Sequence, residues 1–107
     1  MTKMQNNLEH IADLLMYSGP SMSEIIKEAT EENLRFEISQ TSKLNIIKVT
    51  SYIPYEIKVI DSYVFNKDDQ LIKHTVKINN KEKVVFDKYG EAAFLLNNLN
   101  KENTLVS

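Results

Sequence analysis

The sequence predicts an α+β fold, in which an N-terminal helical hairpin precedes an antiparallel β-meander of four to five strands and a C-terminal helix packs on that sheet. Apolar residues recur at helical spacing near both ends of the chain, and the period changes to alternation in the middle. The connections between the alternating segments are short. Short connections favour an antiparallel meander, because parallel neighbours need crossovers of about a dozen or more residues.

Residues 1–32 are expected to form the helical hairpin. The first helix is marked by an apolar stripe at spacings of three and four residues, made by Leu8, Ile11 and Leu15. The segment Ser18-Gly19-Pro20 ends this helix, because Gly tolerates a left-handed C-cap and Pro cannot continue the ladder. Ser21 and Glu24 then have the spacing of a capping box, which predicts the start of the second helix.

Residues 34–86 are expected to form the antiparallel sheet, beginning where Leu34, Phe36 and Ile38 alternate with polar residues. Pro54 lacks an amide donor, so it should separate two strands or lie at an edge. Asn79-Asn80-Lys81 is interpreted as the turn before the last strand. Residues 87–100 should form the C-terminal helix and residues 101–107 a frayed tail, so that residues 1–107 make one domain.

The composition argues against ordinary catalysis. The chain has two glycines, no cysteine and two histidines, so it lacks the residues for a glycine-rich phosphate loop and for a structural zinc site. We therefore expect no catalytic residue, no cofactor and no metal site. His74 is the one candidate general base, and we interpret it as a hydrogen-bonded histidine at the rim of an apolar sheet face. Asn66 to Gln70 is interpreted as a solvated hairpin turn rather than a calcium loop.

No long apolar run or secretory signal is present, so we expect a cytoplasmic protein without membrane contact. The net charge of -2 lowers the expectation of a nucleic-acid binder, which usually has a basic excess. Many residues have AT-rich codons, which suggests a bacterial prophage or mobile element as the source.

Aromatic and apolar side chains suggest a surface for protein contact. Tyrosines cluster around Pro54, and amphipathic aromatics are favoured at interfaces. Two side chains lie outside the expected sheet-facing stripe of the last helix. The candidate interaction residues are Tyr52, Tyr55, Tyr63, Phe94 and Leu95. The alternative is a purely structural role, in which the tyrosines fill the core or cover a sheet edge.

Four lysines of the last predicted hairpin suggest a basic strip that could meet an acidic partner or phosphate: Lys73, Lys77, Lys81 and Lys83. The alternative is a solvated face whose lysines prevent aggregation.

The first helix, its turn and the start of the second helix resemble winged-helix regulators, through Ile11, Leu14, Leu15, Gly19, Pro20, Ser21, Ser23, Glu24 and Ile25. Such regulators insert a third, recognition helix into the major groove. In this chain the residues after Ala29 are expected to form a strand instead.

The sequence therefore predicts a non-enzymatic accessory or regulatory protein that acts by protein contact, with a homodimer as one form of that contact. The alternative is a nucleic-acid-binding regulator with a winged-helix-like N-terminus, and a small-ligand enzyme ranks third.

Overall fold

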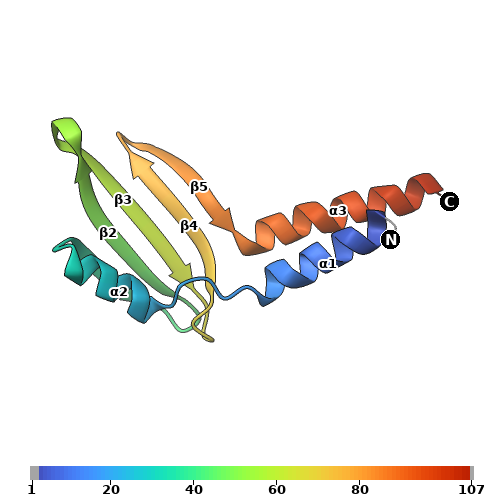
Figure 1. The fold of residues 1–107 in the computed structure, drawn as a ribbon, viewed down its shortest axis with the longest axis horizontal. Helices are drawn as coiled ribbons and strands as arrows, with labels where there is room; N and C mark the ends of the chain where they lie inside the picture. The colour runs from blue at the N-terminus through green and yellow to red at the C-terminus, as the bar shows by residue number, and fades with distance from the viewer. Residues whose placement is uncertain (1–2, 107) are drawn as a thin grey trace. The chain divides into compact units, whose positions relative to one another are not determined.

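The computed structural model describes the backbone of residues 3–106 and the side chains of residues 8–99. Its elements, in chain order, are α1 (Lys3–Met16), α2 (Met22–Glu31), β1 (Arg35–Gln40), β2 (Asn45–Ile53), the short 3-10 turn η1 (Pro54–Glu56), β3 (Ile57–Phe65), β4 (Leu71–Ile78), β5 (Lys81–Asp87) and α3 (Lys88–Val106) (Figure 1). The predicted α+β class is confirmed. The described chain forms two compact units, one comprising Ser18–Asp87 and the other containing α1 and α3.

The sheet is the antiparallel meander that the short connections predict. Its strands lie in the order β1-β2-β3-β4-β5, so every strand pairs with its neighbour in sequence. Pro54 separates β2 from β3, as expected, and β3 runs without a break to Phe65. β1 and β5 are the two edges of this sheet.

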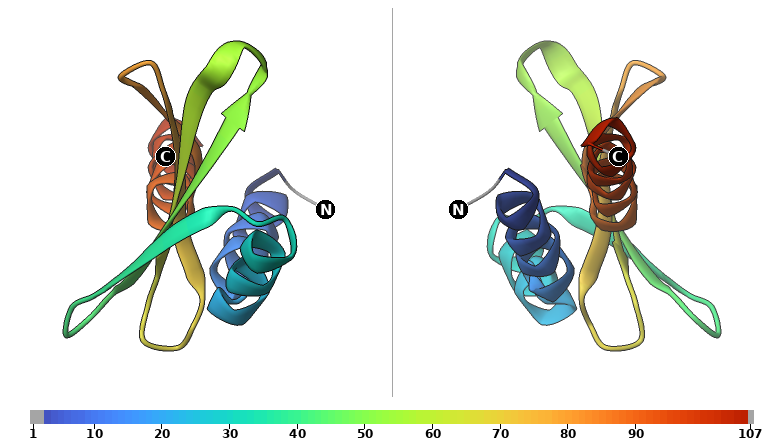
Figure 2. Two further views of the ribbon diagram at one scale, coloured as in Figure 1. Left: turned by 90° about the vertical axis from the view of Figure 1, so that its left-hand side faces the viewer. Right: turned by 90° about the vertical axis from the view of Figure 1, so that its right-hand side faces the viewer.

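Within this unit α2 packs on one face of the sheet through its apolar stripe. Figure 2 shows α2 on one side of the strongly twisted strands. The stripe meets side chains from the three central strands, and the buried cluster consists of Ile25, Ala29, Ile47, Val49, Phe65 and Leu71. Ile47 and Phe65 are fully buried. We call this side of the sheet the helix face and the other side the opposite face.

The N-terminus of α2 is fixed by two side-chain caps. Ser21 Oγ accepts a hydrogen bond from the Glu24 amide at 3.2 Å, at the position that the capping-box spacing predicts. Asp69 Oδ1, from the β3–β4 turn, accepts a hydrogen bond from the Met22 amide at 3.2 Å. The same turn is stabilised by Asn66, whose Oδ1 accepts from the Gln70 amide at 3.0 Å. These bonds agree with the interpretation of this segment as a polar hairpin turn.

The other unit is a helix pair in which α1 contacts α3. Both helices bury apolar residues, and those with less than a tenth of their surface exposed are Ile11, Leu14, Ala92 and Leu99. α3 continues through Val106, so the expected frayed tail from residue 101 is helical over this range. Residue 107 lies outside the described residues.

Lys88, the first residue of α3, is only 1% exposed. Its ammonium Nζ has no hydrogen-bond partner among the described residues. A buried cation without partners is costly, and the positive end of the helix dipole adds an unfavourable interaction at this position. The unpaired ammonium group therefore lowers the stability of the fold.

We expect Lys88→Met to raise the free energy of unfolding by about 1–3 kcal/mol, because it keeps the long apolar stem and removes the unpaired charge. Chemical denaturation followed by circular dichroism measures the change. The matched control is Lys67→Met at an exposed turn position, where the change should stay within about 0.5 kcal/mol. A destabilised Lys88→Met protein would show that the ammonium has a favourable partner.

Candidate interaction surface

Two hairpin turns project from the same end of the sheet. The β2–β3 turn follows the pair Ile53–Ile57, and the β4–β5 turn follows the pair Ile78–Lys81. Val59 pairs with Ile78, which brings the two turns to neighbouring positions, as Figure 1 shows. The α2 cap and the β3–β4 turn lie at the other end of the strands.

The β2–β3 turn exposes an unusual amount of apolar surface. Tyr55 is 95% exposed and Tyr52 is 66% exposed, and Ile53 and Pro54 between them are also exposed. Tyr52 pairs with Lys58 across the hairpin, on the opposite face. A tyrosine offers a large contact area at a small cost in conformational entropy, which makes such a tip suitable for binding another protein.

The backbone of this turn is strained. Tyr55 has φ 69° and ψ 27°, and Glu56 has φ 59°, so both residues occupy the left-handed region. That region costs a residue with a full side chain about 1–3 kcal/mol, whereas Gly, Asn and Asp tolerate it. In the described chain, the other residues with positive φ are all of the tolerant types: Gly19, Asn33, Asp69, Asn79 and Asn80.

The contrast between the two neighbouring turns is informative. The β4–β5 turn also has two consecutive left-handed residues and uses Asn79 and Asn80, the residues that such turns favour. The β2–β3 turn has three residues, and its two positions with positive φ are occupied by Tyr55 and Glu56. Strain that is retained at one exposed position suggests a role for the side chain displayed there.

A polar cluster lies at the centre of the helix face. His74 Nε2 and Asp61 Oδ1 are 2.8 Å apart, and both side chains are partly buried. The ring of Tyr63 stacks on His74 with centroids 4.2 Å apart and an angle of 20° between the planes. His74 is therefore hydrogen-bonded, as expected, but it lies inside the sheet between Tyr63 and Phe86 and not at the rim of the face. Burial, followed by the charges of Asp61 and Glu28, raises the pKa of Tyr63 to about 12.

A cavity of about 200 Å³ adjoins this cluster under the C-terminal half of α2. The charged side chains in its lining are all acidic, Glu28, Glu32 and Asp61, and its apolar walls include Ile25 and Val49. Among the described residues, no three His, Cys, Asp or Glu side chains are grouped closely enough to hold a metal ion.

The predicted interaction residues fall into three places. Tyr52 and Tyr55 lie together at the β2–β3 turn. Tyr63 lies on the helix face, half-buried against His74, so it is part of the polar cluster and does not join the other two tyrosines. Phe94 and Leu95 lie on α3 in the other unit, where Phe94 is 66% exposed and Leu95 is partly buried.

The basic strip is not continuous, because its lysines point to different faces. Lys81 pairs with Ile78 and Lys83 pairs with Val76, so both lie on the helix face. Lys77 pairs with Glu82, and Lys73 shares the opposite face with it. The sequence predicted a turn of three residues, Asn79 to Lys81. Only two residues form it, and this difference of one residue moves Lys83 to the other face.

Sequence reasoning missed Ile53, Asp61 and the exposed pair Val84–Val85. The turn sequence Pro-Tyr-Glu could have indicated the strained turn, since a hairpin turn normally contains Asn, Asp or Gly. Asp61 could not be assigned to His74 without the strand register. The exposure of Val84 and Val85 was not predictable from alternation, because β5 has a bulge at this point. Thr75 pairs with Val84 and His74 with Phe86, which leaves Val85 without a cross-strand partner.

Comparison with known proteins adds no assignment: no family model matches this chain, and no curated protein or solved structure matches it significantly. Among residues 3–106, no helix combines the length and the apolar character that crossing a membrane requires.

We expect the double substitution Tyr55→Asn with Glu56→Gly to raise the free energy of unfolding by about 1–3 kcal/mol, because both new residues tolerate positive φ. Thermal and chemical denaturation measure this change. The reverse exchange, Asn79→Tyr with Asn80→Glu, places the strained pair in the β4–β5 turn and should lower the stability by a similar amount. Equal stability of all three proteins would contradict strain at Tyr55 and Glu56.

We expect Tyr63 to lose its proton with a midpoint near pH 12 in the folded protein. A free tyrosine loses its proton near pH 10, so the unfolded chain ionises first as the pH rises. The contribution of Tyr63 to stability is therefore complete below about pH 10 and is lost between about pH 10 and 12. Tyrosinate absorbance of the wild type minus that of Tyr63→Phe isolates this titration, and a midpoint near 10 would disprove the shift.

Proposed function

We propose that this protein is a small cytoplasmic accessory or regulatory protein that acts by binding another protein through the tip of its β2–β3 hairpin. The observation that carries the proposal is Tyr55, an almost fully exposed aromatic side chain held on a strained left-handed backbone. A bacterial prophage or mobile-element origin, expected from composition alone, belongs to the same proposal.

The surroundings of Tyr55 support this function. Tyr52, Ile53 and Pro54 extend the apolar surface, and Lys58 adds a positive charge beside Tyr52. An aromatic anchor with apolar neighbours and a polar rim is the usual composition of an interface hot spot. The β-sheet holds this tip at a fixed place, so little conformational entropy is lost when a partner binds.

The nucleic-acid alternative receives less support. α2 is followed directly by β1, so the chain has no third helix at the place where a winged-helix regulator has its recognition helix. The lysines of the β4–β5 hairpin are divided between the two faces of the sheet. Phosphate binding draws most of its affinity from many basic groups on one surface, and this division weakens that effect.

Site-specific photocrosslinking tests the proposal. We expect the protein with benzoylphenylalanine in place of Tyr55 to form one discrete adduct in extracts of its own cells. The adduct should be sensitive to protease and resistant to nuclease. An excess of unlabelled wild-type protein should compete for the adduct, whereas the Tyr55→Asn, Glu56→Gly protein should compete at least about tenfold less well, because its hot-spot side chain is missing.

The matched control carries the same crosslinker in place of Tyr89, a tyrosine on α3 that is also exposed. An adduct from position 55 with twice the mass of the chain would identify the partner as a second copy. The proposal fails if the two positions give the same adducts, if position 55 gives none, or if nuclease removes the adduct.

A further inference from the structure

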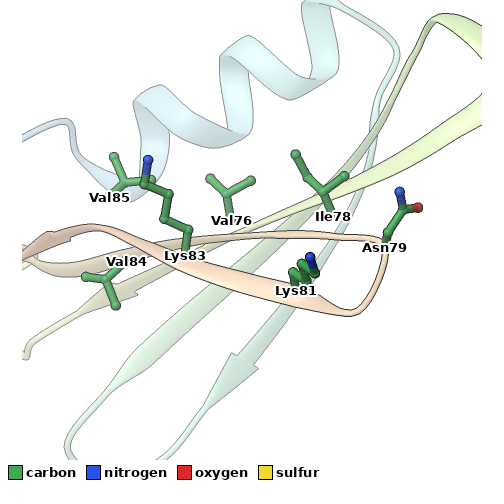
Figure 3. Close-up of a pocket in the computed structure, with 7 residues that line it drawn as sticks. All are labelled: Val76, Ile78, Asn79, Lys81, Lys83, Val84 and Val85. Atoms are coloured by element: carbon green, nitrogen blue, oxygen red, sulfur yellow. The ribbon is translucent and has the colours of Figure 1, made fainter.

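The last strand of the sheet carries a second surface that the proposed function does not use. A groove of about 710 Å³ runs along β4 and β5. Its floor is apolar: Figure 3 shows Val76, Ile78 and Val85 on the same side of the two strands. Lys83 points to this side as well in Figure 3, and the strand register places Lys81 on the same face.

Lys81 and Lys83 are exposed, and neither has an ion-pair or hydrogen-bond partner among the described residues. They are two residues apart on one strand, so they point to the same face with a separation of about 7 Å between their Cα atoms. Glu82 lies between them and points to the opposite face.

β5 also has an open edge over residues 81–85, since it is the last strand in the order of the sheet and no other strand among the described residues pairs with it there. In an antiparallel strand, backbone groups alternate between the two sides, so about half of those in β5 point to this edge. An extended chain that pairs with the edge would place its own side chains directly opposite Lys81, Glu82 and Lys83.

Self-pairing of β5 is unfavourable on charge and geometry. If two copies paired antiparallel about Glu82, Lys81 would lie opposite Lys83, and pairing about Lys83 would place that lysine opposite itself. Like charges in direct cross-strand positions are destabilising. Pairing about Val84 would have to run through the bulge at Val85, which disrupts the ladder. The like charges and the bulge thus disfavour pairing between the β5 edges of two copies.

We propose that the β5 edge binds an extended acidic segment of another protein by strand addition, with two carboxylates at alternate positions opposite Lys81 and Lys83. The residue between those carboxylates faces Glu82 and is neutral or basic. The residue opposite Val84 is apolar. Backbone pairing supplies the affinity, and the alternating charges select the partner and the register.

A titration of the isotope-labelled full-length protein with synthetic octapeptides, followed by amide NMR, tests this proposal. The first peptide has the central sequence Val-Glu-Thr-Glu, and the second has the same composition in the order Val-Thr-Glu-Glu. In an extended strand, only the first places both carboxylates on one face. We expect the first peptide to shift the amide signals of residues 81–85 and to bind about tenfold more tightly than the second.

Two substituted proteins of equal charge separate the specific site from general attraction. Lys81→Glu with Lys83→Glu should abolish binding of the first peptide. Lys73→Glu with Lys77→Glu should leave the binding within about threefold, because these side chains lie on the opposite face of the sheet and cannot contact the two carboxylates.

Backbone methylation of the peptide then tests strand addition. One peptide is methylated at the amides of its two Glu residues, and another at those of Val and Thr. The two peptides therefore lack hydrogen-bond donors on opposite sides of the strand. One of these two peptides should lose binding and the other should keep it. Equal binding of the two peptide orders, equal effects of the two methylations, shifts outside residues 81–85, or self-association through β5 would each overturn the proposal.

Discussion

The packing of α2 on the sheet determines which part of the strands in the Ser18–Asp87 unit is covered and which part is left exposed. α2 has 10 residues, which makes it about 15 Å long, whereas β2 and β3 have 9 residues each and extend about 30 Å. The helix therefore covers about half of the strand length on one face. Its contacts with Ile47, Phe65 and Leu71 bury the end of the strands near the β3–β4 turn, and Asp69 holds the helix there by capping the Met22 amide. The other end, with the β2–β3 and β4–β5 turns, extends beyond the helix.

This uneven cover explains why the chemistry of the sheet changes along its strands. Where α2 ends, the helix face becomes polar: Asp61 and His74 pair with each other, and Tyr63 covers the histidine ring. A hydrogen-bonded pair at this boundary satisfies groups that are only partly accessible to water, as buried polar groups require. At the two turns beyond it, residues 52–56 and 79–85 are exposed, and there the chain has both its strained turn and its uncompensated lysines.

The sequence predicted the order and type of the elements because hydrophobic period is a local property. The Ser21–Glu24 cap, the break at Pro54 and the alternation in β4 each depend on a few neighbouring residues. The faces of the sheet were not predictable in this way, because they depend on register. Counting Lys81 as part of the β4–β5 turn would place Lys83 opposite Lys77, whereas the two-residue turn pairs Lys83 with Val76. For the same reason, the hydrogen bond between Asp61 and His74 was not predictable. The end of α3 was placed too early because residues beyond 100 have no apolar stripe.

Both proposed surfaces follow from violations of local rules that nothing else in the unit requires. A turn with Asn or Gly in place of Tyr55 and Glu56 would be less strained, and the neighbouring turn has asparagines at its two positions with positive φ. Lysines on an edge strand commonly prevent aggregation. Two lysines at alternate positions, with Glu82 between them on the other face, form a charge pattern that distinguishes one incoming strand from another. Departures of this kind concentrate at functional sites, because stability is lost there for a specific contact.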